Sequence, residues 1–119
     1  AGALVASGLA ERLDDTPRSA RELVGDGALD GDTAERILRG AAAVGLLDLS
    51  AAGFRRNRLT RALQPDAPSL GPVAVYFASE VNLRAWSRFL EAVRSGEVPF
   101  RRAHGRGVWA MDVSKLDSR

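Results

Sequence analysis

The sequence predicts a mainly α-helical protein, built as a winged helix (a helix-turn-helix plus a two-stranded wing) followed by long dimerisation helices. Apolar residues recur at helical spacing over residues 1–45, and alternation with a period of two replaces this spacing over 47–59. Helical spacing then returns over 69–95. Three helices followed directly by a hairpin is the element order of a winged helix.

A first helix is predicted over residues 1–13. Its apolar residues form one stripe on one face, which consists of Leu4, Val5, Leu9 and Leu13. The sequence Asp14-Asp15-Thr16-Pro17 is expected to end this helix, because proline and aspartate favour a helix boundary.

The helix-turn-helix is predicted to follow. Ser19 and Glu22 have the spacing of a capping box, which indicates a short helix that ends at Gly25–Gly27. Asp32 and Glu35 repeat this spacing, so a longer helix is predicted to begin there. The side chains that this second helix is expected to bury are Ile37, Leu38, Ala41 and Val44.

Gly45 is placed to end that helix in the left-handed conformation, and a hairpin is predicted directly after it. Leu47-Asp48-Leu49 alternates between apolar and polar residues. The turn is expected at 50–53 and the return strand at 54–59. Thr60 is then expected to cap one more helical turn.

The helical segment over 69–95 is more apolar than one small core can cover. An unbroken helix over this range would be about 40 Å long, and Ser79 and Asn82 can both cap a helix, so a break is predicted near them. Because the remaining apolar surface needs a cover, a homodimer is predicted. The expected dimer contacts include Leu4, Val5, Leu9, Val73, Tyr76 and Phe77.

Length and composition restrict the possible functions. The chain has 119 residues, 45% hydrophobic and 27% charged, which is the composition of one globular domain. It contains no cysteine and one histidine, which excludes disulfides and thiol catalysis and leaves little material for a zinc site. A net charge of +2 gives no strong attraction to nucleic acid or membrane. Neither a membrane-spanning run nor a signal peptide is recognisable, so a cytoplasmic location is predicted.

A winged helix can bind DNA, and arginines support this alternative. Four of them lie on or beside the predicted return strand and two on the predicted recognition helix, namely Arg55, Arg56, Arg58, Arg61, Arg36 and Arg39. Such side chains can contact phosphates and base edges, but they can equally form a solvated face. Asp32 and Glu35 would oppose an approaching phosphate. A winged-helix DNA-binding transcriptional regulator is therefore the alternative, which steeply salt-dependent duplex binding would support.

A pocket for a planar apolar ligand is a further possibility. Its wall would consist of large apolar residues from the C-terminal third, namely Trp86, Phe89, Phe100, Trp109 and Met111. Such residues more commonly pack in a core or an interface. His104 has no partners at catalytic spacing and is expected in a turn. Because Gly25–Gly27 and Gly105–Gly107 lack the strand-to-helix context of a phosphate loop, no catalytic, cofactor-binding or metal-binding residue is predicted.

Several stretches, taken together, resemble one family. They are Thr16–Leu23 (TPRSAREL), Asp32–Leu47 (DTAERILRGAAAVGLL), Asn57–Thr60 (NRLT), Trp86–Phe100 (WSRFLEAVRSGEVPF) and the pair His104-Gly105. The combination covers about residues 1–111 and is similar to the N-terminal winged-helix dimerisation domain of S-adenosylmethionine-dependent O-methyltransferases. The resemblance is to the bacterial members of natural-product biosynthesis. Residues 111–119 depart from the Asp-Pro step that usually follows in that family.

The resemblance implies a division of labour. Methyl transfer in that family belongs to a C-terminal Rossmann-like domain that binds S-adenosylmethionine, and this chain lacks its motifs. Residues 1–95 would form the winged-helix dimerisation domain, and 96–119 would lead into the absent methyltransferase domain. The expected function is a dimerisation and substrate-lid module for an aromatic, polyketide-like acceptor. By this resemblance the chain holds no cofactor and is not catalytic on its own.

Overall fold

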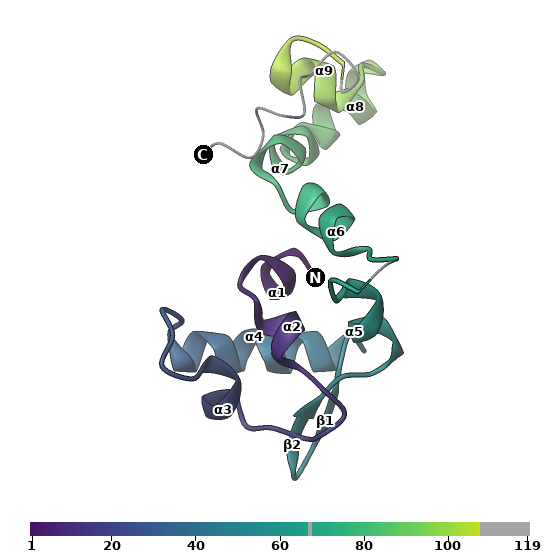
Figure 1. Cartoon of the computed structure of the whole chain (residues 1–119). Helices are drawn as coiled ribbons and strands as arrows, with labels where there is room; N and C mark the ends of the chain where they lie inside the picture. The colour runs from purple at the N-terminus through teal and green to yellow at the C-terminus, as the bar shows by residue number, and fades with distance from the viewer. Residues whose placement is uncertain (67, 108–119) are drawn as a thin grey trace. The chain divides into compact units, whose positions relative to one another are not determined.

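The computed structural model describes residues 1–66 and 68–107 (Figure 1). The chain divides into two compact units, residues 1–76 and residues 77–119. The first unit contains α1 (Gly2–Ala6), α2 (Leu9–Arg12), α3 (Ala20–Val24), α4 (Gly31–Ala43), β1 (Asp48–Ser50), β2 (Gly53–Arg55) and α5 (Arg58–Leu63), and α6 (Gly71–Phe77) runs to its end. The described part of the second unit contains α7 (Glu80–Ser87), α8 (Phe89–Ser95) and α9 (Pro99–His104).

The hydrophobic core of the first unit lies around α4, on which α1 and α3 pack, and α2 packs against α1 and α3 (Figure 1). Leu38 stands at its centre with no exposed surface. The other buried members come from every element up to the wing and are Leu4, Leu9, Ala10, Leu13, Ala20, Leu23, Val24, Ala34, Ala41, Leu47 and Phe54. Leucine and alanine therefore build this core, and Phe54 is the only aromatic among these buried residues.

The predicted winged helix is confirmed. β1 and β2 pair antiparallel with Leu49 opposite Phe54 and Ser50 opposite Gly53. Phe54 also pairs with Arg18 in an isolated bridge, in which each backbone N–H donates to the other residue's carbonyl at 2.8 Å. The wing is thus fixed on its second side by the segment that leads into α3.

The capping box at the start of α3 is confirmed. The backbone N–H of Glu22 donates to Ser19 Oγ at 3.2 Å, and that of Ser19 donates to Glu22 Oε1 at 3.3 Å. Gly45 follows the C-cap of α4 with φ +83°, which is the predicted left-handed position.

The predicted start of α4 is wrong by two residues. The N-cap is Asp30, whose Oδ2 accepts from the backbone N–H of Thr33 at 2.9 Å. Asp32 lies inside the first turn, and Glu35 forms an ion pair with Arg39 instead of reaching back to a cap. Asp30 and Asp32 can each accept a hydrogen bond from the backbone N–H three residues later. The cap that is used is Asp30, because this cap gives the longer hydrogen-bonded helix.

The predicted single helix over 1–13 is two helices. Gly8 adopts a left-handed conformation between α1 and α2. Residues five apart lie about 140° apart around one straight helix, so Leu4 and Leu9 could not both face α4 squarely. The break allows both leucines to be buried at 1% exposure.

The return strand is shorter than predicted. It ends at Arg55, and Leu59 lies in α5. The cap of that helix is Asn57, whose Oδ1 accepts from the backbone N–H groups of Leu59 and Thr60. Thr60 is therefore not the N-cap but completes the capping box by accepting from the N–H of Asn57 at 3.1 Å.

The helices over 69–95 are present but shorter than the pattern predicts. The predicted break is confirmed, since Ser79 is the N-cap of α7. A second interruption at Arg88 separates α7 from α8. In the part of the chain that the structure describes, no helix is both long and apolar enough to cross a bilayer. The predicted domain boundary at residue 95 stays a prediction.

Candidate functional site

The arginines of the wing are paired with carboxylates of the same unit. Asp15 receives hydrogen bonds from both Arg56 and Arg61, each with a closest N–O distance of 3.0 Å. Arg55 lies 3.5 Å from Asp48 across the two strands. On the recognition helix, Arg39 lies 3.2 Å from Glu35. These pairs offset much of the positive charge on which the DNA-binding alternative rests.

Asp15 is the most strongly perturbed group of this surface. The hydrogen bonds from Arg56 and then from Arg61 lower the pKa of its carboxyl from 3.8 to about 2. A hydrogen bond from Arg18 likewise lowers the pKa of the neighbouring Asp14. Asp15 therefore ties the segment between α2 and α3 to Arg56 and Arg61, whereas the pair of Asp14 and Arg18 lies within that segment.

We expect acid to weaken this contact. Because the pKa of Asp15 is lower in the folded chain than in the unfolded chain, its stabilising contribution is complete above about pH 4 and is lost as the pH falls toward 2. Asp15→Asn should reduce the slope of unfolding free energy against pH in this window, measured by urea titration. The pair is exposed, so added salt should reduce the slope of the wild type too. An unchanged slope in Asp15→Asn would show that the ion pairs contribute nothing to folding.

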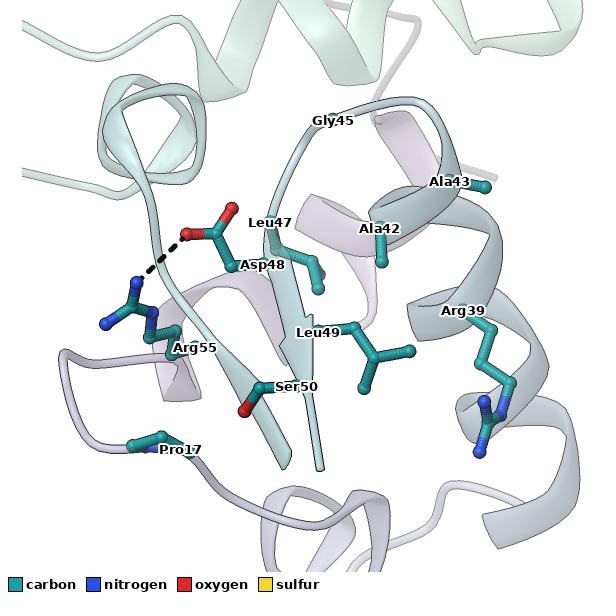
Figure 2. Close-up of a pocket in the computed structure, with 10 residues that line it drawn as sticks. All are labelled: Pro17, Arg39, Ala42, Ala43, Gly45, Leu47, Asp48, Leu49, Ser50 and Arg55. Carbon is teal, nitrogen blue, oxygen red and sulfur yellow. Dashed lines mark hydrogen bonds and ion pairs between the residues drawn. The ribbon is translucent and has the colours of Figure 1, made fainter. Parts of the chain in front are cut away.

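A shallow depression of about 880 Å³ lies between α4 and the wing (Figure 2). The small residues of the end of α4 form one side, and the side chain of Leu49 projects from β1 into the gap (Figure 2). The lining residues are Pro17, Arg39, Ala42, Ala43, Gly45, Leu47, Asp48, Leu49, Ser50 and Arg55. Its two guanidinium groups already have carboxylate partners, and it contains none of the residues predicted for a ligand pocket.

The predicted pocket-wall residues that the structure describes all lie in the second unit. Trp86 and Phe89 form one ring pair, with centroids 5.6 Å apart. Phe100 forms another with His104, at 4.7 Å. Trp109 and Met111 lie outside the described residues. The wall assignment stays a prediction.

Helix α9 is attached to its neighbours by polar contacts. His104 Nε2 lies 2.8 Å from the carbonyl oxygen of Val81 in α7. Arg102 donates to Glu91 Oε2 of α8 at 2.5 Å and to Glu97 Oε2 at 2.7 Å. The Arg102 hydrogen bond is the main reason that the pKa of Glu91 lies below its ordinary value. His104 is thus the last residue of a helix and an anchor, where the sequence predicts a turn.

The predicted dimer contacts fall into two groups. Leu4 and Leu9 are buried in the winged-helix core of the same chain, so they offer almost no surface to a partner. Val5 and Tyr76 are half-buried. Val73 and Phe77 of α6 keep 48% and 59% of their surface exposed. The dimer itself stays a prediction.

Sequence reasoning missed two groups that the structure makes prominent. Asp15 was expected only to help end a helix, and it collects two arginines more than 40 positions later in the chain. Gln64 is 5% exposed and donates from Nε2 to the carbonyls of Ala10 and Leu13 at 2.9 and 2.7 Å. No local pattern marks either partner, because both contacts join distant segments.

The chain is similar in sequence to a mitomycin biosynthesis 6-O-methyltransferase of Streptomyces lavendulae, at 34% identity over 109 residues. This match covers 87% of the chain but 31% of the relative, so the chain spans about a third of the relative's length. No protein-family model matches the chain.

Solved structures give the same result. The mitomycin 7-O-methyltransferase structure matches with a TM-score of 0.71 and 33% identity, covering 89% of this chain and 32% of that one. The N,N-8-amino-8-demethyl-D-riboflavin dimethyltransferase of Streptomyces davawensis matches with a TM-score of 0.70 and 25% identity, covering 91% of this chain and 33% of that one. In both cases a single portion of a larger methyltransferase has this fold.

Proposed function

We propose that this chain, as a relative of one third of an O-methyltransferase, is the winged-helix dimerisation and substrate-lid module of such an enzyme. The enzyme would act on small, aromatic polyketide-like molecules with S-adenosylmethionine as methyl donor. The module would not be catalytic on its own. Its part in the reaction would be to assemble two copies and to close one wall of the acceptor pocket.

The exposed apolar surface of the helices carries this proposal. The winged helix already has a complete core of its own. The second unit nevertheless leaves large apolar side chains more than half exposed, namely Leu83, Trp86, Phe89, Leu90, Val93 and Val98. Single exposed apolar residues are ordinary, but so many on neighbouring helices favour a surface that another protein surface covers.

The dimer contact is assigned to α6 and its surroundings, at Val5, Val73, Tyr76 and Phe77. Leu4 and Leu9 would support this contact indirectly, because their burial holds α1 and α2 in the core. An obligate dimer of this kind buries more than about 2,000 Å² and has no stable folded monomer.

A charged double variant tests the dimer. Val73→Asp with Phe77→Asp would place two carboxylates in the contact, and we expect unfolding or aggregation where the wild type sediments as a folded dimer. The matched control is Leu59→Asp. The exposed fraction of Leu59, 45%, is similar to the 48% of Val73, and Leu59 lies in the first turn of α5, where an acidic residue is favourable. The measurements are analytical ultracentrifugation and circular dichroism. A wild type that stays monomeric at high concentration, together with a folded double variant, would show that no dimer forms through α6.

The lid role is assigned to the aromatic residues of the second unit. Trp86, Phe89 and Phe100 are partly or largely exposed, so their rings could contact a planar acceptor. Trp109 and Met111 complete the proposed wall.

We expect no binding of S-adenosylmethionine to this chain alone. Within the described residues, neither β1 nor β2 leads through a glycine-rich loop into a helix. Such a loop supplies the backbone N–H groups that bind this kind of cofactor, so the described residues do not fit S-adenosylmethionine. No cluster of His, Asp and Glu among the described residues could hold a metal ion either. Isothermal titration calorimetry with the 119-residue chain is the measurement. Micromolar binding would contradict the assignment of the chain as a module without a cofactor site.

A further inference from the structure

We infer that His104 is a specificity-determining residue, which accepts a hydrogen bond from the hydroxyl of a planar hydroxyaromatic ligand whose ring lies against Phe100. This inference rests on the proposed lid role, because it places the ligand at the same wall. The inference assigns to the imidazole of His104 the ability to distinguish a ligand with a free hydroxyl from one whose hydroxyl is methylated.

The contact with α7 decides which nitrogen of His104 carries a proton. Nε2 lies 2.8 Å from the carbonyl oxygen of Val81, and a carbonyl oxygen can only accept. Nε2 must therefore be the donor. In the neutral imidazole this leaves Nδ1 without a proton and with its lone pair available as an acceptor.

The Nδ1 lone pair has no partner among the described residues. The hydrogen bond to Val81 is the one polar contact of His104 in the described part of the chain. The side chain is partly exposed, so a small molecule can approach it. A ligand can donate a hydrogen bond to this lone pair through a hydroxyl or an N–H group. An ether oxygen or a carboxylate has no hydrogen to donate.

An aromatic surface adjoins this acceptor. The ring of Phe100 lies with its centroid 4.7 Å from that of His104, and the two planes are inclined by 49°. Phe100 is also partly exposed. A flat aromatic ligand could contact the Phe100 ring and present a hydroxyl to His104, which is the combination of apolar contact and one placed polar group that small-molecule sites use.

The two side chains are held on a fixed helix. Arg102, which lies between them in the sequence, is bound to Glu91 and Glu97, and His104 itself is bound to α7. Little conformational entropy is then lost when a ligand binds, because the acceptor is already oriented.

The single histidine makes the test specific. The 119-residue chain is labelled with ¹⁵N-histidine and studied by NMR at about pH 8, where an ordinary imidazole is neutral. The free chain should show a protonated Nε2 and an unprotonated Nδ1. The probes are 2-naphthol and 2-methoxynaphthalene. In the second probe a methyl group replaces the hydroxyl hydrogen, so it cannot donate a hydrogen bond. We expect 2-naphthol to shift the Nδ1 resonance and to bind about fivefold more tightly.

Two variants separate the ring contact from the hydrogen bonds. His104→Phe keeps an aromatic ring beside Phe100 but removes both nitrogens, so the two probes should bind with equal affinity. His104→Gln keeps a donor for Val81 and an acceptor, so the preference for 2-naphthol should persist. Circular dichroism and thermal unfolding of each variant verify that α9 is still in place.

The outcomes also separate this inference from the lid proposal. A protonated Nδ1 in the free chain, or equal binding of the two probes by the wild type, overturns the role of His104. If equal binding still perturbs the Phe100 resonances, the lid proposal survives. If neither probe binds, both proposals are wrong.

Discussion

Gly53→Ala is expected to lower the free energy of unfolding by about 3 kcal/mol. Gly53 has φ +131°, a region that is almost restricted to glycine and costs other residues about 1–3 kcal/mol. A Cβ at this position would lie 2.5 Å from the carbonyl oxygen of Arg18 and 2.7 Å from its carbon, both backbone atoms. The Arg18–Phe54 bridge would have to open, with loss of about 1 kcal/mol for each hydrogen bond. Urea unfolding followed by circular dichroism measures the change.

Gly45→Ala is the matched control. Gly45 also has a positive φ, +83°, but apart from its two chain neighbours no residue has an atom within 4 Å of its added Cβ. This variant should therefore lose only the backbone term, about 1–2 kcal/mol. Equal losses in the two variants would mean that the close approach of Arg18 to the wing has no energetic consequence.

Gln64→Met is expected to cost about 3 kcal/mol of folding free energy. The side chain of Gln64 donates to two buried carbonyls, those of Ala10 and Leu13, at the end of α2. Methionine has a similar length and no donor, so both carbonyl oxygens would lose their partner at about 1–3 kcal/mol each. Thermal unfolding monitored by circular dichroism should show a lower midpoint.

Arg56→Met controls for the rest of this network. Arg56 donates from Nη1 to Gln64 Oε1 at 3.2 Å and pairs with the exposed Asp15, so its loss removes contacts without leaving the two carbonyls unpaired. Exposed ion pairs contribute about 0–1 kcal/mol, and the loss should be correspondingly smaller. A loss of folding free energy as large as that of Gln64→Met would show that the contacts of Arg56, and not the hydrogen bonds from Gln64, stabilise the end of α2.

Local signals in the sequence were sufficient for much of the fold. The capping box of Ser19 and Glu22, the left-handed Gly45 and the break at Ser79 each depend on residues within one turn of the site. The period change that predicts the wing is likewise local. Errors arose where two local solutions compete. Asp30 and Asp32 both precede a possible first turn, and Asn57 and Thr60 can both cap α5.

The sequence suggests Phe100 as a wall residue, which stays a prediction, but it places His104 in a turn and assigns it no role. Its contact with Val81 joins residues 23 positions apart. A lone histidine has no sequence spacing that marks a tertiary contact, so only the packing of α9 against α7 reveals that His104 Nε2 lies beside the carbonyl oxygen of Val81.

The sequence by itself determined the element types, the order of helices and hairpin, and the excess of apolar surface, because hydrophobic period and capping chemistry act over a few residues. Only the tertiary structure decided that Leu4 and Leu9 face inward, that Asp15 gathers Arg56 and Arg61, and that Gln64 closes the end of α2. Each of these depends on where a chain reversal brings distant segments together. Successive residues of a helix point about 100° apart around its axis, so a shift of one position in which residue faces the core is enough to exchange a surface residue for a core residue.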